Sequence, residues 1–157
     1  MADEPLTTME NCPQLMLENQ LCFPLYAAAR RVVNHYTPWL KPLGLTYTQY
    51  VVFMCLWEYG ETTVGDLCRR LYLDNGTITP LIKRMEQEGY LTRSRSAEDE
   101  RVVRVRLTER GWAVRDRAKD IPGHVGSCVR LSAEEAVSLH RVLYRLLTSE
   151  DGKDLQA

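Results

Sequence analysis

The hydrophobic periodicity of this chain changes once, from about 3.6 residues to 2, directly after two short helical segments. The first segment covers residues 64–71 and the second runs from Thr77 to Gly89. Apolar and polar residues then alternate over 90–95 and 101–107, on either side of a polar tip. Two short helices followed by a hairpin are typical of a winged helix-turn-helix. The predicted fold class is therefore mainly α with a small β-hairpin wing.

A helical pattern also precedes this element. Apolar residues recur at three- and four-residue steps from about 15 to 36, and Thr37-Pro38 and Lys41-Pro42 predict the end of that helix. Pro24 either opens the main helix in its first turn or kinks a longer one. Thr46 and Gln49 then have capping-box spacing.

The helix that follows, to about Tyr59, is apolar on nearly all sides, which indicates burial in a core or an interface. After the wing, we expect one helix from Thr108 to about Ile121 and a loose stretch over 122–128. A last helix is expected to begin at Ser132, which has capping-box spacing with Glu135.

A chain of 157 residues favours a single domain. We expect that domain to cover residues 15–147, between a flexible N-terminal tail at 1–14 and a C-terminal tail at 148–157. Within it, the winged helix-turn-helix lobe covers 46–107. Two sets of outer helices, 15–45 and 108–147, flank that lobe.

The formal net charge is −1, so nucleic-acid binding would need a local basic surface. Between Thr62 and Arg117, twelve Lys and Arg residues stand against nine Asp and Glu. Ordinary solvent-exposed faces of the second helix and the hairpin explain this excess of basic residues as well as a DNA-binding surface does. The positions of the residues favour DNA binding, because small hydrogen-bonding residues lie at the start of the second helix and arginines lie along the hairpin. The candidate DNA-binding residues are Thr77, Thr79, Pro80, Lys83, Arg84, Arg93, Arg95 and Arg101.

Composition and motif searches exclude several other classes. No apolar stretch approaches the length of a membrane span, and the acidic start does not resemble a signal peptide, so we expect a cytoplasmic protein. Five cysteines are an odd number, which argues against a disulfide framework. The three histidines lack metal-ligand spacing, so we expect no metal and no cofactor. Nucleotide-binding and hydrolase motifs are absent from the sequence, and we expect no enzyme activity.

The run Asp99-Glu100-Arg101, followed by residues 105–111, resembles the wing signature of the MarR family of winged-helix regulators. The resemblance implies that Asp99 and Arg101 brace the wing and that Arg101 enters the minor groove. It also implies a homodimer, built by the outer helices, that binds double-stranded operator DNA with an inverted repeat.

Three further blocks, at 19–23, 43–50 and 73–81, resemble the organic-hydroperoxide-sensing subgroup of that family. The third block contains Asn75, which joins the candidate DNA-binding residues. The resemblance implies a repressor that binds DNA when reduced and is released when an organic hydroperoxide oxidises Cys22. It further implies that Tyr36 and Tyr47 activate the thiol. In the two-cysteine branch, Cys128 would be the resolving cysteine.

Helix geometry sets a condition on this site. A cysteine that attacks peroxide must be a thiolate, which nearby phenols or a helix N-terminus favour. Fourteen residues separate Cys22 from Tyr36, or about 21 Å along one helix at roughly 1.5 Å per residue. The two side chains can therefore meet only if the first helix of a second chain runs antiparallel alongside.

Other interpretations remain open at this point. Cys55 and Cys68 lie in apolar patterns and fit core positions, Cys12 lies in the tail, and Cys22 itself lies on an apolar stripe. The nearest alternative is a MarR-type repressor that is released by a small phenolic or aromatic ligand, with Cys22 structural. An alternative from another class is a thiol peroxidase, in which a winged helix would have no use.

Overall fold

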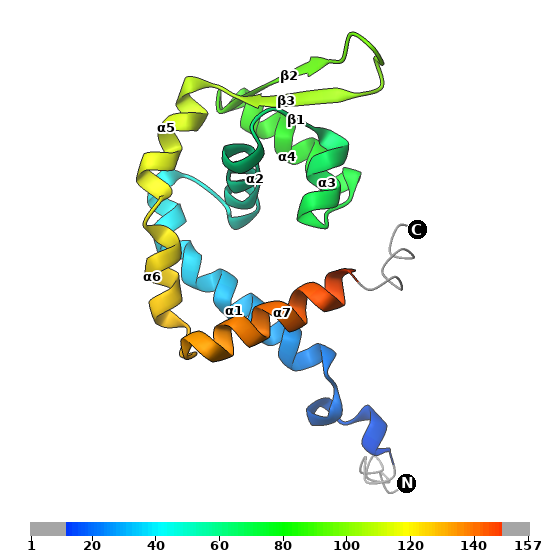
Figure 1. Cartoon of the computed structure of the whole chain (residues 1–157), viewed down its shortest axis with the longest axis vertical. Helices are drawn as coiled ribbons and strands as arrows, with labels where there is room; N and C mark the ends of the chain where they lie inside the picture. Colours follow the sequence, from blue (N-terminus) through cyan, green and yellow to red (C-terminus); the bar gives the residue numbers. More distant parts are fainter. Residues whose placement is uncertain (1–11, 149–157) are drawn as a thin grey trace, which may run out of the picture.

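The computed structural model describes residues 12–148, so residues 1–11 and 149–157 of the expected tails lie outside the described part. A winged helix-turn-helix lobe lies at one end and long helices cross beneath it (Figure 1). The elements in chain order are η2 Pro13–Leu15, η3 Leu17–Asn19, α1 Cys22–Leu40, η4 Lys41–Leu43, α2 Tyr47–Tyr59, β1 Thr62–Thr63, α3 Val64–Leu71, α4 Asn75–Gln87, β2 Leu91–Arg95, β3 Val103–Leu107, α5 Glu109–Ala118, α6 Ile121–Cys128 and α7 Ala133–Thr148.

The wing is an antiparallel hairpin with one short extra strand. β2 pairs with β3 in a register that places Arg93 opposite Val105, and β1 pairs with the other edge of β3. Val105 and Leu107 of β3 are buried whereas Arg104 and Arg106 are exposed, as the alternation predicts. The sequence pattern did not reveal β1, because two residues are too few for a periodicity.

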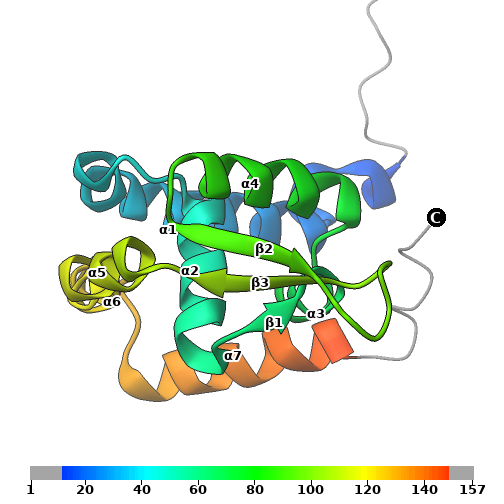
Figure 2. The same cartoon turned by 90° about the horizontal axis from the view of Figure 1, so that it is seen from above.

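The core of the lobe forms around α2. Tyr50, Phe53 and Leu56 of α2 are fully buried, and they belong to one cluster with Ile82 of α4 and Val105 of β3. α4 lies alongside β2 when the lobe is seen from above (Figure 2). The prediction of a helix buried on nearly all sides is confirmed. Burial of α2 fixes the positions of α3, α4 and the wing relative to one another.

Side-chain caps set the beginnings of most helices. In each case the side chain of the N-cap residue accepts a hydrogen bond from the backbone N–H three residues later, which satisfies a donor that the helix leaves unpaired. The capping residues are Thr46, Thr63, Asp74, Thr108 and Ser132. The predicted capping boxes of α2 and α7 are both present.

α1 differs from its prediction at both ends. The helix begins at Cys22, not near residue 15, because residues 13–19 form two separate 3₁₀ turns. Pro24 lies in the first turn, where its missing N–H has no partner to lose. The expected break at Thr37-Pro38 was wrong, since α1 continues to Leu40. Pro38 costs only one hydrogen bond near the helix end, and Leu40 is buried against the lobe there.

The segment after the wing also differs from its prediction. The helix expected from Thr108 to about Ile121 is α5, which ends three residues earlier at Ala118, and a further helix, α6, begins at Ile121. Pro122 lies in the first turn of α6, where proline starts a helix rather than breaking it. The loose stretch predicted at 122–128 is therefore helical. α6 packs on α1, and the rings of Trp39 and His124 stack with their centroids 4.1 Å apart.

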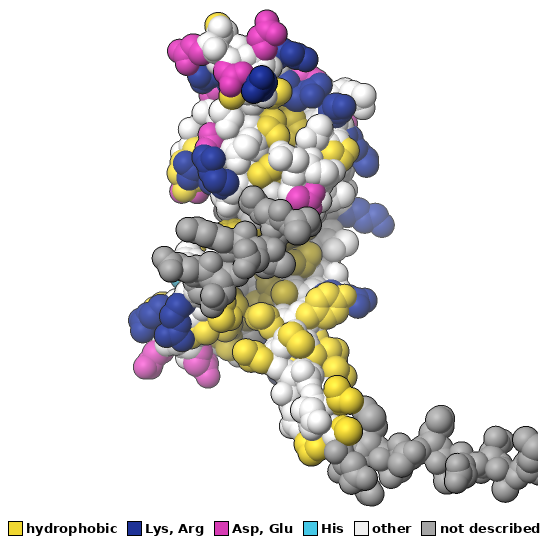
Figure 3. All heavy atoms as spheres, turned by 90° about the vertical axis from the view of Figure 1, so that its right-hand side faces the viewer, with side chains coloured by type: hydrophobic (Ala, Val, Ile, Leu, Met, Phe, Trp, Pro, Cys, Tyr) yellow, Lys and Arg dark blue, Asp and Glu magenta, His cyan; other side chains and the backbone are white. Residues whose placement is uncertain are grey.

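α7 has no buried residue within one chain. Its exposed apolar side chains are Val137, Leu139, Val142, Tyr144, Leu146 and Leu147. The start of α1 carries a similar set, namely Leu21, Phe23, Leu25 and Tyr26. Hydrophobic side chains also gather below the lobe in Figure 3, where the outer helices lie. Apolar surface of this extent marks an interaction face.

Over residues 12–148, none of the helices has the length and apolar character needed to cross a membrane.

Candidate redox and DNA-binding sites

The exposed face of α4 carries most of the candidate DNA-binding residues. Ile78, Ile82 and Met85 point into the core, and the opposite face is exposed. The exposed residues of α4 are Asn75, Gly76, Thr77, Pro80, Lys83, Arg84 and Gln87, and Thr79 is half-buried. The sequence pattern singled out most of this surface.

The beginning of α4 lies two residues earlier than expected. The predicted loop at 74–76 is wrong, because Asp74 caps the helix and Asn75 is its first residue. The Asp74 carboxylate accepts hydrogen bonds from the backbone nitrogen and the hydroxyl of Thr77, at 2.7 and 3.0 Å. These bonds lower the pKa of Asp74, so the capping carboxylate is ionised at neutral pH.

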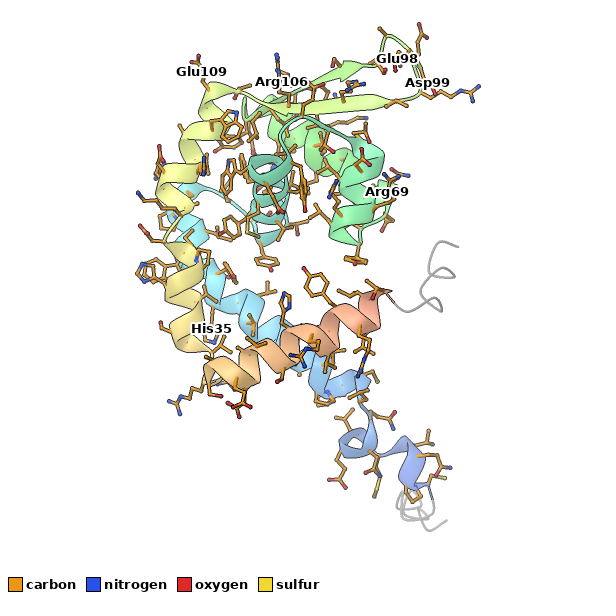
Figure 4. All side chains as sticks on the ribbon, viewed as in Figure 1. His35, Arg69, Glu98, Asp99, Arg106 and Glu109 are labelled. Carbon is orange, nitrogen blue, oxygen red and sulfur yellow. The ribbon has the colours of Figure 1, made fainter. Side chains whose placement is uncertain are left out.

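A groove of about 510 Å³ lies between the wing and helices α3 and α4. Its polar lining side chains are Thr63, Arg69, Asn75, Thr79, Arg93 and Arg101. The groove therefore brings together candidate residues from the second helix and from the hairpin. Arg69, which sequence reasoning missed, forms an ion pair with Asp66 and projects from α3 (Figure 4). Its proximity to the other arginines depends on the docking of the wing, which no local pattern specifies.

The tip of the wing is held by a turn at Asp99. The carboxylate of Asp99 accepts a hydrogen bond from the backbone nitrogen of Arg101 at 2.9 Å. Glu98 and Asp99 lie at the outer end of the hairpin (Figure 4). The side chains of Arg95 and Arg101 are exposed. The structure thus places both arginines on the accessible surface of the wing.

Arg93 has a different position from the other wing arginines. Its Nε and Nη2 donate to Glu86 of α4 at 2.8 and 2.6 Å, and its backbone nitrogen donates to the same carboxylate at 3.0 Å. These bonds lower the pKa of Glu86, and only 29% of the Arg93 side chain is exposed. Arg93 therefore joins the wing to α4. Sequence reasoning missed this pair because Glu86 and Arg93 lie on different elements.

Cys22 is the first residue of α1 and is exposed within one chain. The apolar pattern alone suggested a core position, but the neighbouring Leu21, Phe23 and Leu25 are exposed as well. The side chains around the thiol therefore belong to the interaction face rather than to the core. The sulfur lies at a helix N-terminus, where the helix dipole favours negative charge.

Tyr36 and Tyr47 lie together at the junction of α1 and α2. Their ring centroids are 5.0 Å apart, and the Tyr50 ring lies 5.7 Å from Tyr36. Burial raises the pKa of all three phenols, and that of Tyr50 to about 12. The phenols therefore remain protonated at neutral pH and are hydrogen-bond donors. A pocket of about 420 Å³ lies beside Tyr47.

The thiol and the tyrosine pair lie far apart within one chain. Cys22 and Tyr36 belong to the same continuous helix, which keeps them about 21 Å apart along its axis. The structure thus brings Tyr36 and Tyr47 together and does not bring Cys22 to them in the same protomer.

Cys128 is the last residue of α6, and it is exposed. Its thiol donates a hydrogen bond to the carbonyl oxygen of His124 at 3.4 Å, and the ring of His124 stacks on Trp39. Only the short link 129–132 separates Cys128 from α7. A displacement of Cys128 would therefore shift α6 and α7 together.

The remaining cysteines have other surroundings. Cys55 is buried in the core, which raises its thiol pKa. Cys68 is partly buried, has a raised pKa for the same reason, and donates to the Asn75 amide oxygen at 3.3 Å. Cys12 is partly buried before the first 3₁₀ turn. Within residues 12–148 no cluster of His, Cys, Asp and Glu has the geometry of a metal site.

Comparison with known proteins identifies a common family. The MarR family model matches residues 45–103. The organic hydroperoxide resistance transcriptional regulator of Bacillus subtilis is 47% identical over 140 residues, which cover 88% of this chain and 95% of that protein. The structure of reduced AbfR bound to DNA superposes with a TM-score of 0.69 at 34% identity, covering 85% of this chain and 91% of that one. AbfR is a protein of Staphylococcus epidermidis.

A second AbfR structure, with a disulfide formed, has a TM-score of 0.59 at 34% identity and covers 85% of this chain and 94% of that one. These similarities extend over both the winged lobe and the outer helices. The predicted fold class, mainly helical with a small antiparallel wing, is confirmed. The chain belongs to the MarR family of winged-helix transcriptional regulators.

Proposed function

We propose that this protein is a homodimeric transcriptional repressor that senses organic hydroperoxides through Cys22. The reduced dimer binds operator DNA, and the oxidised dimer releases it. One observation carries the proposal: Cys22 is an exposed thiol at one end of α1, and the other end of that helix bears Tyr36 beside Tyr47. The 47% identical relative, which is named for organic hydroperoxide resistance, supports this assignment.

The tyrosine pair serves the thiol of the partner protomer. In an antiparallel pair of α1 helices, Cys22 of one chain lies beside Tyr36 and Tyr47 of the other. The exposed apolar surface around Cys22 and along α7 supports this pairing, because a second copy covers it. Both phenols are protonated and donate hydrogen bonds to the thiolate, which stabilises it.

Oxidation proceeds in two steps. The Cys22 thiolate attacks the outer peroxide oxygen, the O–O bond breaks, and the departing alkoxide takes a proton to leave as an alcohol. The resulting sulfenic acid condenses with the thiol of Cys128 from the other subunit, which forms a disulfide and releases water. Together the two steps reduce one hydroperoxide and oxidise two thiols.

DNA binding uses the exposed face of α4 and the wing. In a two-fold symmetric dimer, two α4 helices about one DNA turn apart, roughly 34–36 Å, fit an inverted repeat. The residues that we assign to the DNA surface are Asn75, Thr77, Thr79, Pro80, Lys83, Arg84, Arg95, Asp99 and Arg101. Arg93 supports this surface through Glu86. A disulfide at Cys128 displaces α6 and α7, which changes the separation of the two lobes.

The chemistry is stoichiometric, so the protein is a regulator and not an enzyme. Each thiol pair consumes one hydroperoxide and must be reduced before it responds again. The regulatory relatives support this assignment. A repressor acts where its operator DNA lies, so we assign the protein to the cytoplasm. It has no need of a metal or an organic cofactor.

The test is a titration of the reduced dimer on an operator selected from random double-stranded DNA. Binding is measured before and after one equivalent of an alkyl hydroperoxide, and again after a thiol reductant. We expect loss of binding and full recovery with the reductant. Unchanged binding would favour a repressor that is released by a small ligand, and sustained peroxide consumption would favour a thiol peroxidase.

A further inference from the structure

Gln49 is the most buried polar side chain of the described residues, with 1% of its surface exposed. Its amide makes two separate connections. The oxygen accepts a hydrogen bond from the backbone nitrogen of Thr46 at 2.9 Å, which completes the capping box of α2. The nitrogen donates to a carboxylate oxygen of Glu88 at 3.1 Å, on a different element of the lobe. Capping requires only the first connection.

Glu88 follows the last residue of α4 and uses its second carboxylate oxygen for Arg84. That oxygen accepts a hydrogen bond from Nε of Arg84 at 2.9 Å. Within residues 12–148 the Nη groups of Arg84 have no hydrogen-bond partner. Since guanidinium carries five N–H donors, four of them remain for a phosphate or a guanine edge. Glu88 thus holds the Arg84 side chain through Nε and leaves both Nη groups available.

A chain of hydrogen bonds therefore runs from the start of α2 to an exposed arginine of α4. Its first member, Thr46, directly precedes Tyr47, and Gln49 directly precedes the buried Tyr50. Both tyrosines belong to the aromatic cluster with Tyr36. This relay, which consists of Thr46, Gln49, Glu88 and Arg84, ends at the Arg84 side chain, which is 66% exposed on the proposed DNA-binding face. One end of this relay thus lies at the tyrosines and the other at the DNA surface.

We propose that Gln49 and Glu88 are positioning residues that hold Arg84 in its DNA-binding orientation and make that orientation depend on the start of α2. The inference rests on the proposed function, which assigns Arg84 to the DNA surface. It also explains the residue at position 49. Glutamate completes a capping box as well as glutamine does. Here it would place a second carboxylate against Glu88, whereas the amide of Gln49 donates to it.

The experiment uses four variants of the full-length reduced homodimer: Gln49→Glu, Glu88→Gln, the double variant that carries both changes, and Arg84→Ala. Operator and non-operator duplexes of equal length serve as probes, and thermal unfolding reports stability. Arg84→Ala should weaken operator binding at least tenfold, as expected for the loss of one specific contact. Gln49→Glu should do the same, because it retains the capping oxygen but repels Glu88.

The double variant is the decisive comparison. With the groups exchanged, the amide of residue 88 donates to the carboxylate of residue 49, and its oxygen still accepts from Arg84. Gln49→Glu should therefore weaken operator binding in the wild-type background and strengthen it in the Glu88→Gln background. If the single Gln49→Glu variant does not fold, the comparison of the double variant with Glu88→Gln still tests the proposal, because the second substitution should strengthen operator binding in that background. A role in stability alone would move the unfolding temperature without moving the ratio of operator to non-operator affinity.

Oxidation gives a second readout. Peroxide treatment should weaken operator binding by a smaller factor in Gln49→Glu than in wild type, since the reduced variant already lacks a well-placed Arg84. The relay is wrong if Gln49→Glu keeps wild-type operator affinity and oxidation response while Arg84→Ala loses affinity. If Arg84→Ala itself binds the operator normally, the assignment of Arg84 to the DNA surface is wrong instead.

Discussion

The carbonyl oxygen of Tyr90 lies within clashing distance of the position that a β-carbon would take on Gly111. A methyl of Leu107 lies 2.9 Å from the same position. Tyr90 precedes the first wing strand and Gly111 lies in the first turn of α5. The indole nitrogen of Trp57 also donates to the Gly111 carbonyl at 3.4 Å. The approach of Tyr90 to Gly111 therefore packs the start of the wing closely against α5.

Gly111→Ala should therefore lower the stability of the dimer by about 1–3 kcal/mol, because the added carbon must displace backbone. Urea denaturation measures the change. Gly126→Ala in α6 is the matched control, since nothing lies within 4 Å of its added carbon. We expect that control to stabilise the protein by up to about 1 kcal/mol, as alanine does within a helix. Equal effects of the two substitutions would contradict the packing argument.

Tyr36→Phe and Tyr47→Phe should slow the oxidation of Cys22. Each variant removes a hydroxyl that we assign to the partner's thiolate and keeps the ring that packs at the α1–α2 junction. The thiolate fraction at neutral pH, followed by ultraviolet absorbance, should fall in each variant. Operator binding by the reduced protein should remain close to wild type. If both variants keep the wild-type thiolate fraction, the tyrosines are packing residues only.

Mild peroxide treatment should produce a covalent dimer on non-reducing electrophoresis. The dimer should be absent in Cys22→Ser and in Cys128→Ser, because each contributes one sulfur. Cys55→Ala is the control, since that thiol is buried in the core and should not affect cross-linking. A covalent dimer that persists in Cys128→Ser would show that another thiol resolves Cys22.

Arg101→Ala and Arg93→Ala should have different effects, because we assign a DNA contact to Arg101 and the support of the wing to Arg93. Arg101 is exposed, so its loss should weaken operator binding and reduce the salt dependence of binding without lowering the unfolding temperature. Arg93→Ala leaves the half-buried Glu86 without its partner and should lower the unfolding temperature as well. Equal unfolding temperatures for the two variants would argue against the supporting role of Arg93.

Alkaline pH should destabilise the protein through the tyrosine cluster. Folding raises the pKa of Tyr50 from 10.0 to about 12, because burial disfavours the phenolate. Its contribution to stability is complete below pH 10 and is lost as the pH rises through about 12. Tyr50→Phe should flatten this part of the curve of unfolding free energy against pH. An unchanged slope in that variant would assign the effect to other groups.

The winged lobe could be predicted from the sequence because its signals are local. Thr46 accepts the hydrogen bond that its spacing with Gln49 indicated, and the alternation in β3 gives the buried face. The prolines were the main errors. Pro38 is tolerated within α1 and Pro122 begins α6, since each effect depends on the position of the proline in its helix.

The candidate site was predictable only in part. Periodicity placed Cys22 on an apolar stripe and could not distinguish a core from an interaction face, so the resemblance alone singled it out. The Glu86–Arg93 and Gln49–Glu88 bonds join residues on different elements. Such contacts follow from how the elements dock, which no local spacing encodes. The bonds to Glu86 direct the Arg93 guanidinium toward α4, and its contact with DNA remains a prediction.

The length of α1 has a genetic consequence. In the proposed dimer, each sensing site combines the thiol of one protomer with the phenols of its partner, because one helix keeps Cys22 about 21 Å from Tyr36. A cell that expresses a Cys22→Ser allele together with a Tyr36→Phe, Tyr47→Phe allele makes mixed dimers. Each mixed dimer has one fully intact site and one doubly defective site. Two alleles that fail to respond separately should therefore complement each other within a single dimer.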